Sequence, residues 1–145
     1  MDLDTLTEIE VTALIKELKY FLKNPQIDVP MFGQYKHEET ILDKLNNIEY
    51  KFKTYRGKLD TKYSIHIRFL DNNKHLVRLC INGSNHINND GVKVSGNHIH
   101  IYKFDGKEQT DYAYELDKFP FDKDDDLAES VSNFIKFVNI KKNTV

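Results

Sequence analysis

This sequence lacks the residues on which several structural classes depend. Cys80 is the only cysteine among 145 residues, and there is no tryptophan. A single cysteine excludes an internal disulfide and a thiolate zinc cluster within one chain, so we expect a reducing compartment. No apolar run approaches the ~20 residues that a membrane-spanning helix needs, and the acidic start MDLDTLTEIEV does not resemble a secretory leader. These absences predict a cytoplasmic protein with no membrane association.

The composition is that of one ordinary globular domain. Hydrophobic residues make up 39% of the chain and charged residues 30%, which predicts a single domain over residues 1–145 with one core. The formal net charge is −2, so the chain as a whole has no attraction for nucleic acid. Any site for a polyanion must therefore be a local patch of Arg, Lys and His side chains.

The two ends of the chain have the apolar spacing of helices. Over residues 4–24 the expected buried stripe is Leu6, Ile9, Ala13, Leu14, Leu18, Phe21 and Leu22. A capping box, Thr5 with Glu8 or Thr7 with Glu10, precedes it. A second helix is expected over residues 124–141, with a buried stripe of Leu127, Val131, Phe134, Ile135 and Val138. Its three leading aspartates, residues 124–126, indicate a charged helix start and lack the spacing of a calcium loop.

The middle of the chain alternates with a period of two residues, which is typical of strands. Five strands are expected, at residues 50–54, 63–69, 77–81, 98–104 and 112–116. Residues 25–47 are interrupted by Pro25, Pro30 and Gly33, and we expect a loop with a short strand or a helical turn there. The predicted fold class is α+β, an about five-stranded antiparallel sheet with N-terminal and C-terminal helices packed on one face.

If the apolar positions of these strands share the buried face, the alternate positions must point together toward water. Those positions carry imidazole, guanidinium, thiol and phenol groups: His66, Arg68, Arg78, Cys80, His98, His100 and Tyr102. The loop at residues 82–91 adds His86 and is rich in Asn, Asp and Gly. A loop of this length and polarity is more often functional than a plain hairpin connection.

The same segment resembles the central motif of an uncharacterised family of small proteins from bacteria and their phages. The motif reads Arg-Leu-x-Ile-Asn-Gly, then His, then Asn-x-Asp-Gly, then His-x-His-x-Tyr. It falls on Arg78, Leu79, Ile81, Asn82, Gly83, His86, Asn88, Asp90, Gly91, His98, His100 and Tyr102. Ser84 and Asn97 stand where the family favours proline. The resemblance implies a phage or mobile-element setting and assigns no activity.

The residue types predict a metal-independent endoribonuclease that needs no cofactor. Cleavage of RNA by its own 2′-hydroxyl requires a base, an acid and a cation. His98 or His100 is the expected base, with the other or His86 as the acid. Arg78 or Arg68 stabilises charge, and Tyr102 orients the phosphate. The expected substrate-binding residues are Arg68, His66, Asn82, Asn88 and Asp90. Such an RNA-binding enzyme is typical of toxin–antitoxin systems.

Two alternatives use other chemistry. His86, Asp90, His98 and His100 supply imidazole and carboxylate groups that suit zinc or another transition metal. A non-enzymatic binding protein, such as a phage-encoded inhibitor of host defence or an antitoxin-like partner, is the other alternative. Its docking patch would be Phe119-Pro120-Phe121 with the aspartate-rich residues 122–126.

Overall fold

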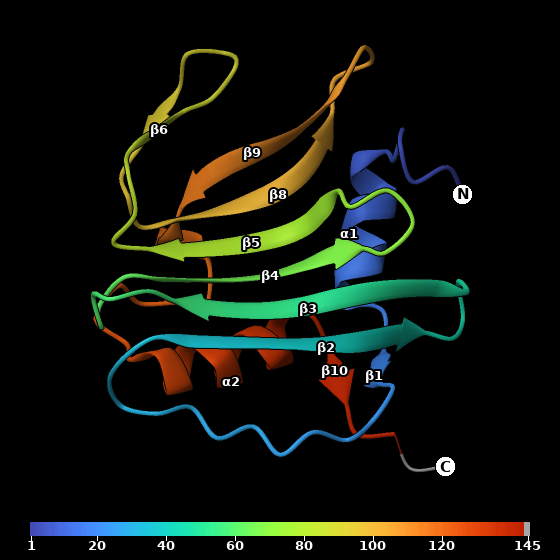
Figure 1. The fold of residues 1–145 in the computed structure, drawn as a ribbon. Helices are drawn as coiled ribbons and strands as arrows, with labels where there is room; N and C mark the ends of the chain where they lie inside the picture. The colour runs from blue at the N-terminus through green and yellow to red at the C-terminus, as the bar shows by residue number, and fades with distance from the viewer. Residues whose placement is uncertain (144–145) are drawn as a thin grey trace.

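The computed structural model describes residues 1–143, and its main feature is one eight-stranded sheet (Figure 1). The elements in chain order are α1 (Glu8–Lys16), β1 (Lys19–Phe21), β2 (Tyr35–Asp43), β3 (Ile48–Arg56), β4 (Tyr63–Phe69), β5 (His75–Ile81), β6 (His86–Ile87), β7 (Lys93–Val94), β8 (His98–Phe104), β9 (Gln109–Glu115), a 3-10 turn (Leu116–Lys118), α2 (Leu127–Phe137) and β10 (Ile140–Lys141).

The strand order in the sheet is β10-β1-β2-β3-β4-β5-β8-β9, and β6 pairs with β7 in a separate ribbon. Neighbouring strands are antiparallel except β1 and β10, which are parallel. The expected strands from β3 to β5, and β8 and β9, are present close to their predicted bounds. The connections between β2 and β5 are short hairpins. The ribbon of β6 and β7 interrupts the step from β5 to β8.

The predicted fold class was wrong, because the sheet is mixed and has eight strands where five antiparallel strands were expected. The largest omission is β2, a nine-residue strand within the stretch interpreted as mainly loop. Its sequence YKHEETILD is mostly polar, and the Pro and Gly residues before it hide its start. The short strands β1 and β10 were assigned to the ends of helices, because runs of two or three residues fit either period.

Both helices are shorter than expected, and the buried face of α1 differs from the prediction. Thr7 forms the capping box with Glu10, as one of the two predicted options. However, Ile9 is 83% exposed, and the helix buries Val11, Leu14 and Ile15 instead. The helix ends at Lys16, well before Asn24, because the chain turns there into β1.

A buried lysine fixes this turn from helix to strand. The Lys19 side chain is fully buried, and its ammonium donates to backbone carbonyls at 2.6–3.1 Å, which belong to Leu14, Ile15, Glu17 and Val138. The carbonyls at the end of a helix have no partner within the helix. Lys19 therefore satisfies the end of α1 and joins it to the segment that leads into β10.

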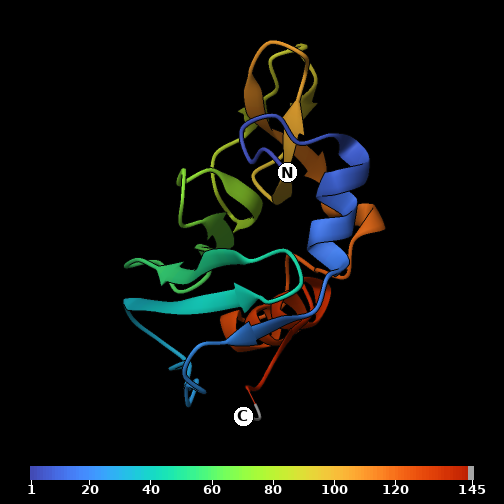
Figure 2. The same ribbon diagram turned by 90° about the vertical axis from the view of Figure 1, so that its right-hand side faces the viewer.

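Figure 2 shows α1 and α2 on the same side of the sheet, so the opposite face of the central strands has no helix over it. The core lies between the helices and the sheet. Phe134 of α2 packs against Phe52 of β3, with ring centroids 6.0 Å apart, and Ile65, Ile67, Leu79 and Ile99 are fully buried there. The uncovered face carries the alternate side chains of the same strands, as the two-residue period predicts.

Candidate functional site

The register of β5 and β8 places four polar side chains together on the uncovered face. Arg78 lies opposite His100, and Cys80 lies opposite His98. Side chains directly opposite each other in an antiparallel pair have Cβ atoms ~4.5–5.5 Å apart. The sheet therefore brings two imidazoles, one guanidinium and one thiol into contact, as the alternation in the sequence predicts.

Backbone carbonyls define the orientation of both imidazoles. Nδ1 of His98 bonds to the carbonyl of Ser95, and Nδ1 of His100 bonds to the carbonyl of Asp111 at 2.9 Å. A carbonyl oxygen only accepts, so both Nδ1 atoms carry the proton and donate. In the neutral rings both Nε2 atoms therefore present a lone pair. These two atoms are 3.0 Å apart.

Arg78 completes this cluster and makes it electropositive. Its Nη2 lies 3.3 Å from Nε2 of His100 and donates to it. Burial lowers the pKa of His98, and burial with the nearby Arg78 charge lowers the pKa of His100 to about 4. Both rings are therefore neutral at physiological pH. Burial also raises the pKa of the Cys80 thiol, so that group is neutral too.

The third imidazole comes from the ribbon of β6 and β7. The ring centroid of His86 is 4.9 Å from that of His100 and 5.9 Å from that of His98. The ribbon is closed at its base by a bond of 2.9 Å from the amide of Gly83 to the carbonyl of Gly96. This contact holds the loop against the end of β8, so that His86 reaches the two strand histidines.

A cavity of about 630 Å³ opens beside the cluster. Its polar and charged lining includes Lys58, Lys62, Arg78, His86, His98 and His100. None of the described residues that line it is an aspartate or a glutamate. A pocket with three cationic side chains, three imidazoles and no carboxylate is suited to an anion.

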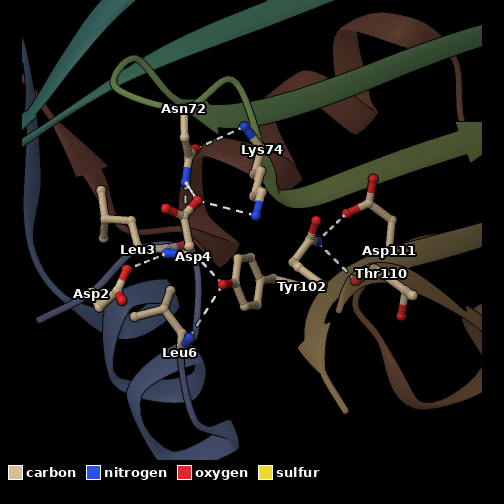
Figure 3. A network of polar contacts seen from close by, with 10 residues as sticks. Asp2, Leu3, Asp4, Leu6, Asn72, Lys74, Tyr102, Thr110 and Asp111 are labelled. Atoms are coloured by element: carbon tan, nitrogen blue, oxygen red, sulfur yellow. Dashed lines mark hydrogen bonds and ion pairs between the residues drawn. The ribbon is translucent and has the colours of Figure 1, made fainter. Parts of the chain in front are cut away.

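Tyr102 was predicted to orient the phosphate, but its hydroxyl points elsewhere. It donates to the carbonyl of Leu3 at 2.8 Å and accepts from the amide of Leu6 at 3.2 Å (Figure 3). Its ring packs edge-on against Phe69, with centroids 6.2 Å apart. Tyr102 therefore anchors the segment before α1 and lines none of the pocket walls described above.

Three residues expected to bind substrate instead shape the loop. The Asn88 side chain pairs with both backbone groups of Ala113 at 2.8 and 3.0 Å, and so ties the ribbon to β9. Asp90 accepts from the hydroxyl of Tyr112 at 2.7 Å. Asn82 adopts a positive φ of 54° and donates to the carbonyl of Thr61 at 2.7 Å. These contacts explain the loop's polar composition without a ligand.

His66 and Arg68 lie on the uncovered face, farther along β4 than the pocket-lining Ser64, and do not line the pocket themselves. Nη1 of Arg68 donates to Nε2 of His66 at 3.1 Å, and the His66 ring packs on His75 with centroids 4.4 Å apart. His75 in turn bonds to Asp111 at 3.3 Å. This second polar cluster therefore borders the first through Asp111, whose carbonyl holds His100.

The interpretation of the sequence did not assign a role to Cys80, Lys58 or Lys62. Cys80 is opposite His98 in the register, which pairing of the expected strands would have shown. Lys62 continues the alternation of Ser64, His66 and Arg68, so the two-residue period already placed it on this face. Lys58 sits in the turn between β3 and β4, and nothing in the sequence indicates its direction.

The aromatic segment suggested as a docking patch packs largely inward. Phe121 is 6% exposed and contacts Phe134 and Phe137. The half-buried Phe119 also packs against Phe137. Asp126 is the N-cap of α2 and accepts from the amide of Glu129 at 2.8 Å. The segment therefore connects the sheet to the start of α2.

Comparisons with known proteins concern nearly the whole domain. No curated protein and no solved structure matches the chain significantly. Among residues 1–143, no helix is long and apolar enough to cross a membrane. The sequence model of a family of unknown function (DUF6978) matches residues 6–140. The match spans all of the sheet strands up to the start of β10, together with both helices and the pocket. The chain therefore belongs to this family of unknown function, DUF6978.

Proposed function

We propose that the protein binds single-stranded RNA on its uncovered sheet face and cleaves it in the pocket without a metal ion. The observation that carries the proposal is the pocket beside Arg78, His86 and His100, which has cationic and imidazole walls and no carboxylate among its described lining residues. A phosphodiester supplies the negative charge that such a pocket lacks. A toxin-like role in a phage or mobile element belongs to the same proposal.

The charges on the uncovered face support a polyanionic ligand despite the net charge of −2. Basic side chains follow this face and its bordering turn: Lys36, Lys51, Lys53, Lys58, Lys62, Arg68 and Arg78. The strand register gives the same face four acidic side chains, Glu38, Glu49, Asp111 and Glu115. Of these, Asp111 already bonds to His75 and Glu115 to Ser95. Lysine and arginine in such a stripe neutralise successive phosphates. The exposed Tyr55 ring, which also lines the pocket, offers a surface on which a base stacks.

The proposed base is a histidine whose tautomer is fixed by a hydrogen bond to the backbone. Nε2 of His100 has a lone pair, because Nδ1 donates to Asp111. Arg78 donates to this nitrogen in the free protein, and in the proposed reaction it turns to the phosphate. The freed nitrogen then takes the proton of the 2′-hydroxyl, whose oxygen attacks the phosphorus. His86 gives a proton to the departing 5′-oxygen, and Arg78 stabilises the extra charge on the phosphorane. The products are a 2′,3′-cyclic phosphate and a 5′-hydroxyl.

The low pKa of His100 is consistent with this role. Burial and Arg78 lower it to about 4 in the free protein, which keeps the ring unprotonated and ready to accept. A phosphate bound in the pocket places a negative charge near the ring and raises its pKa toward the range in which a base works well. The basic character of His100 therefore increases when the substrate binds.

Cleavage of a labelled single-stranded RNA in excess EDTA tests the proposal, with DNA of the same sequence as the control. We expect RNA to yield cyclic-phosphate ends and DNA to stay intact, because DNA has no 2′-hydroxyl. His86→Ala and His100→Ala should each lower the rate by ~10²–10⁴-fold. His37→Ala is the matched control, since His37 lies on β2 and pairs with Glu39.

Binding is measured on the same RNA by fluorescence anisotropy at several salt concentrations. Lys53→Glu should weaken binding and reduce the salt dependence. Lys136→Glu, on α2 behind the sheet, should leave both unchanged. Intact RNA after long incubation with folded protein, or equal cleavage by wild type and the His100→Ala variant, would contradict the proposed reaction.

A further inference from the structure

His98, His100 and Cys80 together suit a second role, which is distinct from the proposed RNA cleavage. One nitrogen each of His98 and His100 and the sulfur of Cys80 all lie within 4.8 Å of one another. They come from adjacent strands in direct register. Within residues 1–143 this is a set of soft and borderline donor atoms around one point, of the kind that transition metals prefer.

The ring orientations favour a cation at that point. Both Nδ1 atoms donate to backbone carbonyls, those of Ser95 and Asp111, so both Nε2 lone pairs face each other across 3.0 Å. Of these two nitrogens, only Nε2 of His100 accepts from Arg78. The lone pair of His98 therefore faces another lone pair, which is repulsive unless a positive charge lies between them.

We propose that a divalent transition metal of the zinc class binds to Nε2 of His98, Nε2 of His100 and Sγ of Cys80. Two nitrogens bound to one tetrahedral zinc ion at ~2.0–2.1 Å lie about 3.3–3.4 Å apart, close to the separation of these two atoms. Three protein ligands leave the fourth position open, as in many reactive zinc sites. On binding, the Cys80 thiol loses its proton to solvent and the sulfur binds as a thiolate.

The surroundings of the ligands also fit a metal site. Histidines that bind metals usually donate their other ring N–H to a carboxylate or a backbone carbonyl, which fixes the tautomer. Both histidines do so here. This ligand set differs from the one that the sequence suggested, because Asp90 bonds to Tyr112 and Cys80 takes its place.

Arg78 must move when the metal binds, because the ion takes the lone pair to which its guanidinium donates. The Nε of Arg78 is buried and has no hydrogen-bond partner among the described residues. The metal-bound thiolate, or an anion at the open position, provides a new acceptor for this side chain. The metal also occupies the atom proposed as the base, so it should oppose RNA cleavage.

Cobalt(II) added to untagged, EDTA-treated and desalted protein tests the inference by absorption spectroscopy. We expect one ion per chain, with a sulfur-to-cobalt charge-transfer band and the strong visible bands of tetrahedral cobalt. Zinc should displace the cobalt and abolish the bands. Cys80→Ser should lose the charge-transfer band, and His98→Gln should weaken binding by about 10–100-fold. His37→Ala should behave as wild type.

The readout does not depend on RNA cleavage, so the two proposals fail separately. His86→Ala should lose cleavage and retain the cobalt spectrum. Absence of a saturable spectrum in folded wild-type protein would overturn the metal site and leave the nuclease proposal standing. A charge-transfer band that persists in Cys80→Ser, or cobalt affinity that is unchanged in His98→Gln, would also overturn it.

Discussion

Gly96 lies so close to Gly83 that a Cβ atom on Gly96 would come within 2.1 Å of the Gly83 carbonyl oxygen. The reverse change is different, because a Cβ on Gly83 would meet its nearest neighbour, the carbonyl oxygen of Gly96, at an ordinary 3.6 Å. This one-sided contact closes the base of the loop that holds His86. The loop can approach the sheet in this way only if residue 96 has no side chain.

Gly96→Ala should therefore displace the ribbon of β6 and β7 and move His86 away from His100. We expect RNA cleavage to fall by at least ~10-fold, because one proton-transfer group loses its position. Gly83→Ala is the matched control and should retain both the fold and the rate. Equal rates for the two variants would show that the position of His86 does not limit the reaction.

Tyr102→Phe tests the reassignment of this residue from the site to the anchor of the N-terminal segment. The change removes the hydroxyl that bonds to Leu3 and Leu6, so the free energy of unfolding should fall by about 1–2 kcal/mol. Urea denaturation measures the loss. The cleavage rate of the folded variant should match wild type, and a 100-fold slower rate would return Tyr102 to the reaction.

Lys19→Met removes the donor that satisfies the end of α1. Several buried carbonyls would be left without their partner, and we expect the free energy of unfolding to fall by about 3 kcal/mol. Lys16→Met, at the exposed last residue of the same helix, is the control and should change stability little. Urea denaturation of both variants measures the difference. A Lys19→Met protein as stable as wild type would contradict the interpretation.

His66 should contribute to the loss of stability in acid. Burial, with the nearby His75 and Arg68, lowers its pKa from 6.5 to about 3 in the folded protein. Below pH 6.5 the unfolded chain binds a proton that the folded chain does not, so stability falls as the pH decreases toward 3. The slope for one such proton approaches ~1.4 kcal/mol per pH unit.

The variant His66→Gln keeps an acceptor for Arg68 and cannot take up this proton. Its melting temperature should therefore fall less than that of wild type between pH 7 and pH 5, as measured by circular dichroism. An identical fall in the two proteins would show that His66 is protonated in the folded state.

Much of the central sheet could be predicted, because alternation reports directly on two-sided strands. The buried Ile65, Ile67 and Leu79 required Arg78, His98 and His100 to share the other face, and that placement is confirmed. Alternation cannot say which strands are missing. The polar strand β2 has little apolar alternation of its own, and only its pairing with β1 and β3 identifies it as a strand.

The details of the site depended on contacts between segments distant in the sequence. Tyr102 lies an even number of positions from His98 and His100, so alternation predicts the same face for all three. However, its hydroxyl bonds to Leu3 and Leu6 of the N-terminal segment. Asn88 and Asp90 looked like ligands because polar loop residues often are, and here they bond to β9 residues. A single sequence does not reveal such long-range partners.

The parallel pairing of β1 with β10 affects how the chain must fold. Lys19 in β1 faces Ile140 in β10, and its ammonium also bonds to the carbonyl of Val138. During synthesis, α1 and β1 emerge more than a hundred residues before this partner. Until then the Lys19 charge and one edge of β1 stay in water, so the N-terminal segment should reach its buried state among the last parts of the domain.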